Sequence, residues 1–297
     1  MVLSFVWNKN NTFFHGLPRF ILSADMDEWH DILPCLLNKR LVWYSQCNTL
    51  FSIVSERYLQ QAQWKRLGLT ECAKNGDLEG VKYLVERCEA DVHARDEKAL
   101  RLASEHCHLD VVRYLVEECE ADVHARNEDA LQWASAKGHL EVVQYSVECG
   151  ADVHAGYDYA LRLASQNGHL EVVKFLVQKC GADVHARDEE ALRAASLYGH
   201  LEVVRYLVES GADVHACGDG ALRWASESGD LEVVKYLVEK GANVHADNDW
   251  ALLFASCNGH LDVVRFLIES GADVHAALLV IWKSWNIWKA KELEKNR

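Results

Sequence analysis

The sequence predicts an all-α solenoid of about seven helical repeats, with an N-terminal helical cap region and a C-terminal capping helix. One observation is that a five-residue phrase, A-[DN]-V-H-A, returns at intervals of 31, 30, 31, 30, 30 and 30 residues. The phrase starts at Ala90, Ala121, Ala151, Ala182, Ala212, Ala242 and Ala272. The other observation is that each unit holds two short apolar segments, which cannot bury their apolar sides alone. Stacking of successive units supplies the missing core, as in other repeat architectures.

The second segment of each unit predicts a one-sided helix. In one representative unit its apolar residues are Leu170, Val173, Leu176 and Val177. Spacings of three, six and seven residues place these side chains on one face of an α-helix. On the outer face Glu171 and Lys174 are three residues apart, so they can form a weak ion pair.

The first segment of each unit predicts a helix built from small residues. Residues 191–196 read A-L-R-A-A-S, and such side chains allow a neighbouring helix to approach closely. Gly199 is expected to end this helix, and the next helix follows His200. At the equivalent position Asp77 and Asp230 are good N-cap residues. Glycines placed for a left-handed C-cap follow the second helix at Gly150, Gly181, Gly211, Gly241 and Gly271.

The repeated phrase G-[HD]-L-[ED]-V-V-x-[YF]-L-V-E-x-G-A-D-V resembles the ankyrin repeat over residues 67–276. The resemblance implies helix–turn–helix units whose first helices and loops bind a protein partner on a concave face. Two departures from the family pattern stand out: the usual T-P-L-H motif reads A-L-R, and the link before it is about three residues short of a 33-residue period. We therefore expect a reduced β-hairpin finger or a simple turn. The short period is similar to that of ankyrin-repeat proteins of giant DNA viruses.

The two ends of the chain depart from the repeat. Residues 1–66 are rich in aromatic side chains and are expected to form a helical region that caps the first repeat. An alternative is an interaction module, because the phrase Trp64-Lys65-Arg66-Leu67 resembles the end of an F-box, although the expected L-P-x-E opening is missing. Residues 277–297 predict a capping helix with a charged end; docking to a partner or a membrane surface is the alternative.

Four residues in the first three repeats differ from the residue type that the other repeats hold at the same position. Glu89 and Glu120 stand where later units have glycine, and Cys107 replaces a turn glycine. A residue other than glycine held in the left-handed region costs about 1 kcal/mol. Ser146 stands where the other units have a leucine, which should lose about 2 kcal/mol of burial. The segment 107–146 is therefore predicted to be the least stable part of the array.

The charge and composition of the chain disfavour some classes of binding partner and location. The chain carries a net charge of −14. The two ends are basic, so the array between them carries −19, which disfavours nucleic acid and favours a protein partner with a basic surface. A role in solubility alone is the other interpretation. No apolar run reaches the ~18 residues of a membrane helix, and no signal peptide is evident. We expect a monomer that does not associate with membranes. Its expected location is the cytoplasm, which is the cytoplasm of the host if the protein is viral.

Fifteen histidines and ten cysteines invite a metal or disulfide hypothesis. Most of them recur once per repeat, however, and stacked helices lie about 8–10 Å apart. Metal ligands and disulfide partners must lie closer than that. Histidines are therefore expected to link loop backbones, and cysteines to be reduced thiols in a reducing compartment. No catalytic or phosphate-binding motif is present, so we expect no cofactor, no metal and no enzyme activity.

Differences between the repeats indicate where a partner would bind, because the scaffold itself is constant. The apolar or aromatic members of the variable positions around the first helix are Tyr157, Tyr159, Leu197, Tyr198 and Trp250. Aromatic side chains are favoured as binding anchors, so these five residues are the predicted site. Alternatively, these differences between repeats accumulated at random after the repeats were duplicated and do not mark a site. Trp133, Trp224 and Phe254, at the position of Leu102 and Leu163, are predicted to lie in the core.

Overall fold

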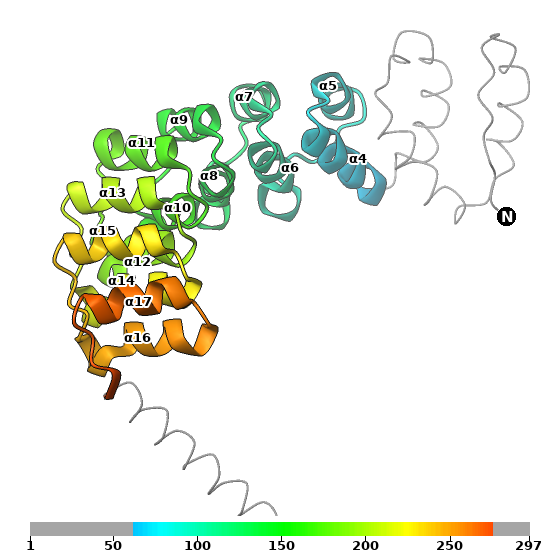
Figure 1. Ribbon diagram of the computed structural model, residues 1–297. Coiled ribbons are helices and arrows are strands. Elements are labelled where there is room, and N and C mark those ends of the chain that lie inside the picture. The colour runs from blue at the N-terminus through cyan, green and yellow to red at the C-terminus, as the bar shows by residue number, and fades with distance from the viewer. Residues whose placement is uncertain (1–61, 276–297) are drawn as a thin grey trace, which may run out of the picture. The chain divides into compact units, whose positions relative to one another are not determined.

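The computed structural model describes residues 62–275, which form fourteen α-helices without a strand (Figure 1). The helices follow one another in pairs, and each of the seven pairs corresponds to one sequence repeat. The predicted all-α class and repeat architecture are confirmed. No helix within this range is long and apolar enough to cross a membrane.

The described helices belong to two compact units, one ending at Asp122 and the other starting at Val123. The first contains α4 (Ala62–Asn75), α5 (Leu78–Glu86), α6 (Ala94–Glu105) and α7 (Leu109–Glu117). The second contains α8 (Ala125–Lys137), α9 (Leu140–Glu148), α10 (Ala155–Gln166), α11 (Leu170–Cys180), α12 (Ala186–Leu197), α13 (Leu201–Glu209), α14 (Ala216–Ser228), α15 (Leu231–Glu239), α16 (Ala246–Asn258) and α17 (Leu261–Glu269).

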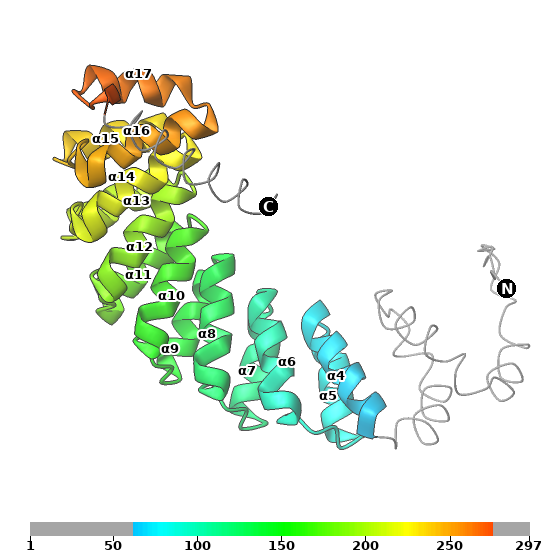
Figure 2. The same ribbon diagram turned by 90° about the horizontal axis from the view of Figure 1, so that it is seen from below.

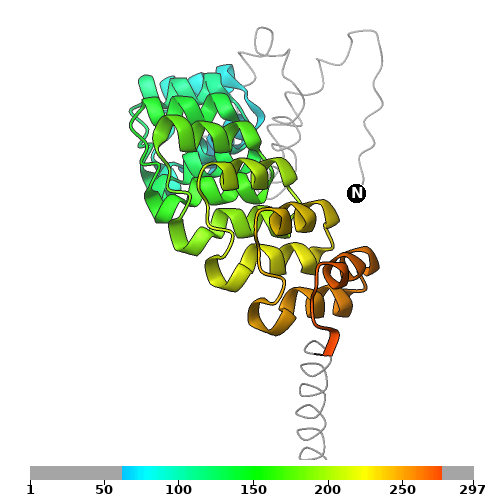
Figure 3. The same cartoon turned by 60° about the vertical axis from the view of Figure 1, so that its left-hand side comes forward.

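In the second unit the helices stack in two rows (Figures 2 and 3). The even-numbered helices α8 to α16 form one row, and the odd-numbered helices α9 to α17 form the other. Neighbouring even-numbered helices pack against each other more extensively than neighbouring odd-numbered ones do. Because a stack bends toward its more closely packed row, the even-numbered helices line the concave side of this unit. We call the exposed side of α8, α10, α12, α14 and α16 the first-helix face.

The same positions are buried in nearly every repeat. The leucine of the A-L-R motif is almost fully buried each time, at Leu100, Leu131, Leu161, Leu192, Leu222 and Leu252. In the second helix the paired valines and the following leucine are buried, for example Val203, Val204 and Leu207 in α13. These residues recur at helical spacing, so one apolar stripe per helix faces the core between the two rows.

A single left-handed turn replaces the β-hairpin finger. After each D-V-H triplet, three consecutive residues have φ between 49° and 69°, as at Arg187, Asp188 and Glu189. The equivalent turns are residues 95–97, 126–128, 156–158, 217–219 and 247–249. The expectation of a simple turn is confirmed. Left-handed backbone costs about 1 kcal/mol per residue other than glycine, so each turn needs compensating contacts.

Histidines at the start of the second helices link each repeat to the preceding one. In the second unit the Nε2 atoms of His169, His200 and His260 lie 2.9–3.0 Å from backbone carbonyl oxygens of the repeat before. In the first unit His108 does the same with the Lys74 carbonyl at 2.9 Å. A carbonyl only accepts, so Nε2 carries the proton in each case. The expected loop-linking role is confirmed for these four histidines.

The irregular early repeats adopt the backbone that their sequence predicts. Glu89, Cys107 and Glu120 have φ values of 52°, 63° and 55°, in the left-handed region. Ser146 is buried at the position of the core leucines, and its hydroxyl donates to the Val142 carbonyl at 2.9 Å. Both features confirm the structural basis of the predicted weak segment, whose lower stability stays a prediction.

Replacing Ser146 with leucine should stabilise the protein by about 1–2 kcal/mol, because apolar burial replaces a hydroxyl bonded within its own helix. Every other repeat holds leucine at this position, so the scaffold accepts the side chain. Thermal unfolding should show a higher Tm, and amide exchange should slow in residues 107–146. A Tm that is unchanged or lower, or wild-type exchange no faster in 107–146 than in 201–268, would contradict this account.

The predicted end regions lie almost wholly outside the described residues. Of residues 1–66 only 62–66 are described, as the beginning of α4, and none of residues 277–297 is. The cap and ligase-docking interpretations of the N-terminal region therefore stay predictions. The same holds for the cap and docking interpretations of the C-terminal segment.

Candidate protein-binding surface

The predicted site residues lie along the first-helix face and on the turns beside it. Tyr157 belongs to the left-handed turn that precedes the regular part of α10, and its side chain is 74% exposed. Tyr159 follows it in α10 and is half-buried under the guanidinium of Arg162, 4.1 Å from the ring centroid. One tyrosine is therefore free to contact a partner, while the other already stacks with a cation.

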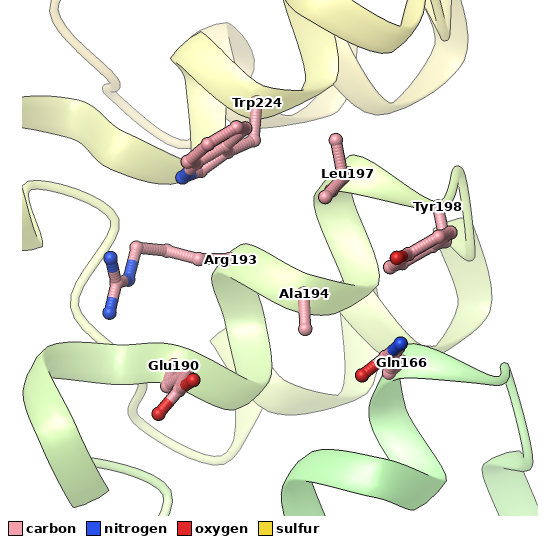
Figure 4. Close-up of a pocket in the computed structure, with 7 residues that line it drawn as sticks. All are labelled: Gln166, Glu190, Arg193, Ala194, Leu197, Tyr198 and Trp224. Atoms are coloured by element: carbon pink, nitrogen blue, oxygen red, sulfur yellow. The ribbon is translucent and has the colours of Figure 1, made fainter.

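Leu197 and Tyr198 end α12 and line a cavity of about 230 Å³ (Figure 4). Tyr198 is 54% exposed, and Leu197 is half-buried. The remaining lining residues come from three neighbouring helices and are Gln166, Glu190, Arg193, Ala194 and Trp224. The structure thus brings two of the five predicted residues into one concave site. Tyr157, Tyr159 and Trp250 are not among the lining residues.

Trp250 lies on α16 and is 37% exposed. Its ring meets Phe254 edge-to-face at 5.8 Å, and the Arg223 guanidinium lies 5.3 Å from its centroid. Edge-to-face packing and a cation over the ring hold this large side chain in one orientation. Trp250 therefore presents an aromatic surface of fixed orientation, and it does not line the cavity.

The prediction that Trp133, Trp224 and Phe254 lie in the core is wrong. Trp133 is 42% exposed, and the other two are half-buried. Each stands two residues after the buried leucine of its motif, and two residues correspond to about 200° around a helix, on the far side from the core. Trp224 instead lines the cavity. The signal that could have revealed this position is its wide variation in size, from alanine to tryptophan, whereas the core positions keep one residue type in nearly every repeat.

Ion pairs connect successive helices along the first-helix face. Arg162 pairs with Glu190 of the next repeat, and Arg187 reaches the same carboxylate at 3.0 Å. Arg223 lies 3.8 Å from Asp247 of the repeat that follows it. These arginines and their acidic partners are therefore paired within the protein and are not available to a binding partner.

An acidic residue closes each left-handed turn and is buried against a histidine four residues earlier. In the second unit His185 Nδ1 lies 2.6 Å from Glu189, and His215 Nδ1 lies 3.1 Å from Asp219. The equivalent acids are Glu97, Glu128, Asp158 and Asp249, each bonded to its own histidine. These hydrogen bonds are the contacts that offset the left-handed backbone. The sequence carried a signal for them, because an acidic residue stands four positions after the histidine of the D-V-H triplet in six successive repeats.

Three of these histidines have shifted pKa values, two of them raised and one lowered. The hydrogen bond to Glu189 raises the pKa of His185 above its usual 6.5, and the bond to Glu97 does the same for His93. Burial lowers the pKa of His169, which lies at the start of α11 and faces the preceding repeat. Within residues 62–275 no three His, Cys, Asp or Glu side chains gather closely enough to hold a metal ion.

Removal of His185 should destabilise the protein more at about pH 5.5 than at about pH 8.5. A raised folded-state pKa gives stability that is fully present below the unfolded pKa and is lost as pH rises through the folded value. His169 is the matched control with the opposite sign, because its lowered pKa gives stability that is lost as pH falls. Urea unfolding of His185→Ala and His169→Ala at both pH values measures this. Equal pH trends for the two variants would contradict the assignment.

Comparison with known proteins agrees with this architecture. A family model of three ankyrin repeats matches residues 69–157, 149–217 and 194–277, which together cover well over half of the chain. No curated protein matches the sequence. Ankyrin repeats are protein-interaction scaffolds, typically without catalytic activity. The helix pairs, their stacking and this match place the chain in the ankyrin-repeat family.

Proposed function

We propose that the protein binds a protein partner on the first-helix face and its turns, without catalysing a reaction. The observation that carries this proposal is the concentration of exposed or half-exposed aromatic side chains there, at Tyr157, Tyr198, Trp224 and Trp250. Binding energy in protein interfaces is concentrated on such residues. The constant core and matched ion pairs hold them on a rigid support.

The charge of the array supports a partner with a basic surface. Residues 67–275 carry −19, whereas Arg162–Glu190 and Arg223–Asp247 are paired within the first-helix face. A net field of this sign accelerates encounter with a basic protein and is screened by salt. Association that slows as ionic strength rises would support this part of the proposal, and association that accelerates would contradict it.

The partner is identified by pull-down and mass spectrometry with the full chain, and its affinity is then measured with purified protein. Tyr198→Ala and Tyr157→Ala should each weaken binding about tenfold or more. Leu261→Ala is the matched control, because Leu261 is an exposed apolar side chain on α17, in the other row. A partner that every variant of the first-helix face retains at full affinity refutes the proposal.

A second function, substrate adaptor of a ubiquitin ligase, depends on the phrase Trp64-Lys65-Arg66-Leu67 alone. In that case the array selects the substrate and residues 1–66 contact the ligase. Capture of ligase subunits by the full chain, but not by a chain lacking residues 1–66, would favour it. The cytoplasmic, reducing location remains part of the proposal and rests on the cysteine pattern.

A further inference from the structure

Arg193 differs from the other arginines of its row. Arg162 and Arg223, at the same position of the neighbouring repeats, each form an ion pair with the repeat that follows. Arg193 forms no ion pair with any described residue: its Nη2 donates to the Arg187 carbonyl at 3.1 Å. Its Nε is buried without a hydrogen-bond partner in the described part of the chain. A buried donor without a partner costs stability unless something else satisfies it.

Comparison of the repeats explains why Arg193 has no ion-pair partner among the described residues. Arg162 pairs with Glu190, but one repeat later that position is Gly220. Arg223 pairs with Asp247, but one repeat earlier that position is Cys217. Both acidic partners are therefore missing from α14 and its turn. A side chain at position 220 would also collide with Arg193, since a Cβ there would lie 2.9 Å from Arg193 Cδ.

The cavity beside Arg193 exists because one side chain of the row is small. Ala194 occupies the position at which the neighbouring repeats hold Leu163 and Trp224. The space of about 230 Å³ that remains is bordered by Leu197, Tyr198 and Trp224, with Arg193 on the opposite side from Tyr198 (Figure 4). This volume is below the roughly 300–1,000 Å³ of small-molecule sites. It suits one large side chain of a peptide.

The charge at the cavity favours an acidic ligand group. Glu190, the only acidic residue among those that line it, forms ion pairs with Arg162 and Arg187, although its Oε2 makes no hydrogen bond to a described residue. Among the residues that line the cavity, Arg193 is thus the one charged group with an unused donor. A carboxylate next to an arginine forms hydrogen bonds about twice as strong as neutral ones.

We propose that this cavity binds a partner segment in which an aspartate or glutamate adjoins a large apolar residue. The apolar side chain fills the space above Ala194, and the carboxylate accepts from Arg193. This inference rests on the proposed function and names the contact that a partner makes at one point of the first-helix face. A basic partner surface elsewhere is compatible with it, since the acidic contact is local.

The test is selection of short random peptides displayed on phage, with the full chain as bait. Enriched sequences should carry Asp or Glu next to Leu, Phe or Trp. A synthetic peptide of the consensus should bind, and its Glu→Gln version should bind about tenfold more weakly. Selection on an Arg193→Glu bait should instead enrich Lys or Arg beside the apolar residue.

Two variants locate the binding site, each with a matched control. Ala194→Trp fills the cavity and should reduce affinity for the consensus peptide at least tenfold, whereas Leu163→Trp, the same position one repeat earlier, should not. Tryptophan is tolerated there, because Trp133 and Trp224 occupy it in other repeats. Arg193→Gln should weaken binding about tenfold, while Arg101→Gln, at the same position three repeats earlier, should change it little.

Several results would overturn the inference: no enrichment, a consensus without acidic residues, or binding that Ala194→Trp leaves intact. They are distinguishable from failure of the proposed function, which is measured separately with the captured partner. If Tyr157→Ala weakens that partner while Ala194→Trp and Arg193→Gln do not, the first-helix face binds it but this cavity does not.

Discussion

Replacing Gly168 with alanine should lower the free energy of unfolding by about 3 kcal/mol. Gly168 has φ of 76°, and a Cβ there would lie 2.5 Å from Nδ1 of His200 in the next repeat. The substitution therefore adds left-handed strain and a steric overlap with a histidine whose position is fixed by its hydrogen bond to the Gln166 carbonyl at 2.9 Å. Urea unfolding followed by circular dichroism measures the loss.

Gly181 supplies the matched control. Its φ of 73° is nearly the same, but no neighbouring atom lies within 4 Å of the place that a Cβ would occupy. Gly181→Ala should therefore cost only the backbone term, about 1 kcal/mol. The difference between the two variants isolates the contact with His200, and His200→Ala in the Gly168→Ala background should recover part of it. Equal losses in both variants would mean that the close approach contributes nothing.

Replacing Asp219 with alanine should cost about 3 kcal/mol, because this buried carboxylate serves two repeats. Its Oδ1 lies 3.1 Å from His215 Nδ1 in its own repeat and accepts from the Asn243 backbone N–H of the next repeat at 2.7 Å. Alanine leaves the Asn243 N–H without its partner and removes the contact that offsets a left-handed turn. Thermal and urea unfolding of the full chain both report the change.

Glu189 is the comparison for Asp219. It occupies the same position of the preceding turn and bonds His185, but its second carboxylate oxygen has no hydrogen-bond partner among the described residues. Glu189→Ala should therefore cost clearly less than Asp219→Ala. If it costs as much, the bond between repeats is not the source of the effect.

Much of the fold was predictable because the repeat constrains it. Leucines and valines recur at helical spacing, and a side chain that is the same in all units of one chain, such as Leu192, indicates a position that stacking buries. The short link before the A-L-R motif excluded a full β-hairpin, and the structure shows a turn. Even the left-handed conformations of Glu89 and Glu120 followed from the glycines at the same positions of later units.

The binding surface was only partly predictable. Tyr157 and Tyr198 are exposed, as expected of variable positions, but Trp224 was assigned to the core. It stands two residues after the buried Leu222, about 200° around the helix, so it faces away from the core. The cavity above Ala194 is a difference between neighbours: it requires a small residue in one helix and large ones beside it.

The sequence by itself determined the number of repeats, their two helices and their core, because each of these follows from a pattern within a single unit. Only the tertiary structure decided which charges remain unpaired and where space remains. Arg193 has no ion-pair partner among the described residues because Gly220 and Cys217 stand where other repeats hold the acidic partners Glu190 and Asp247. An ion pair or a cavity between two repeats depends on which side chains those two repeats combine, and the pattern shared by all repeats does not specify that combination.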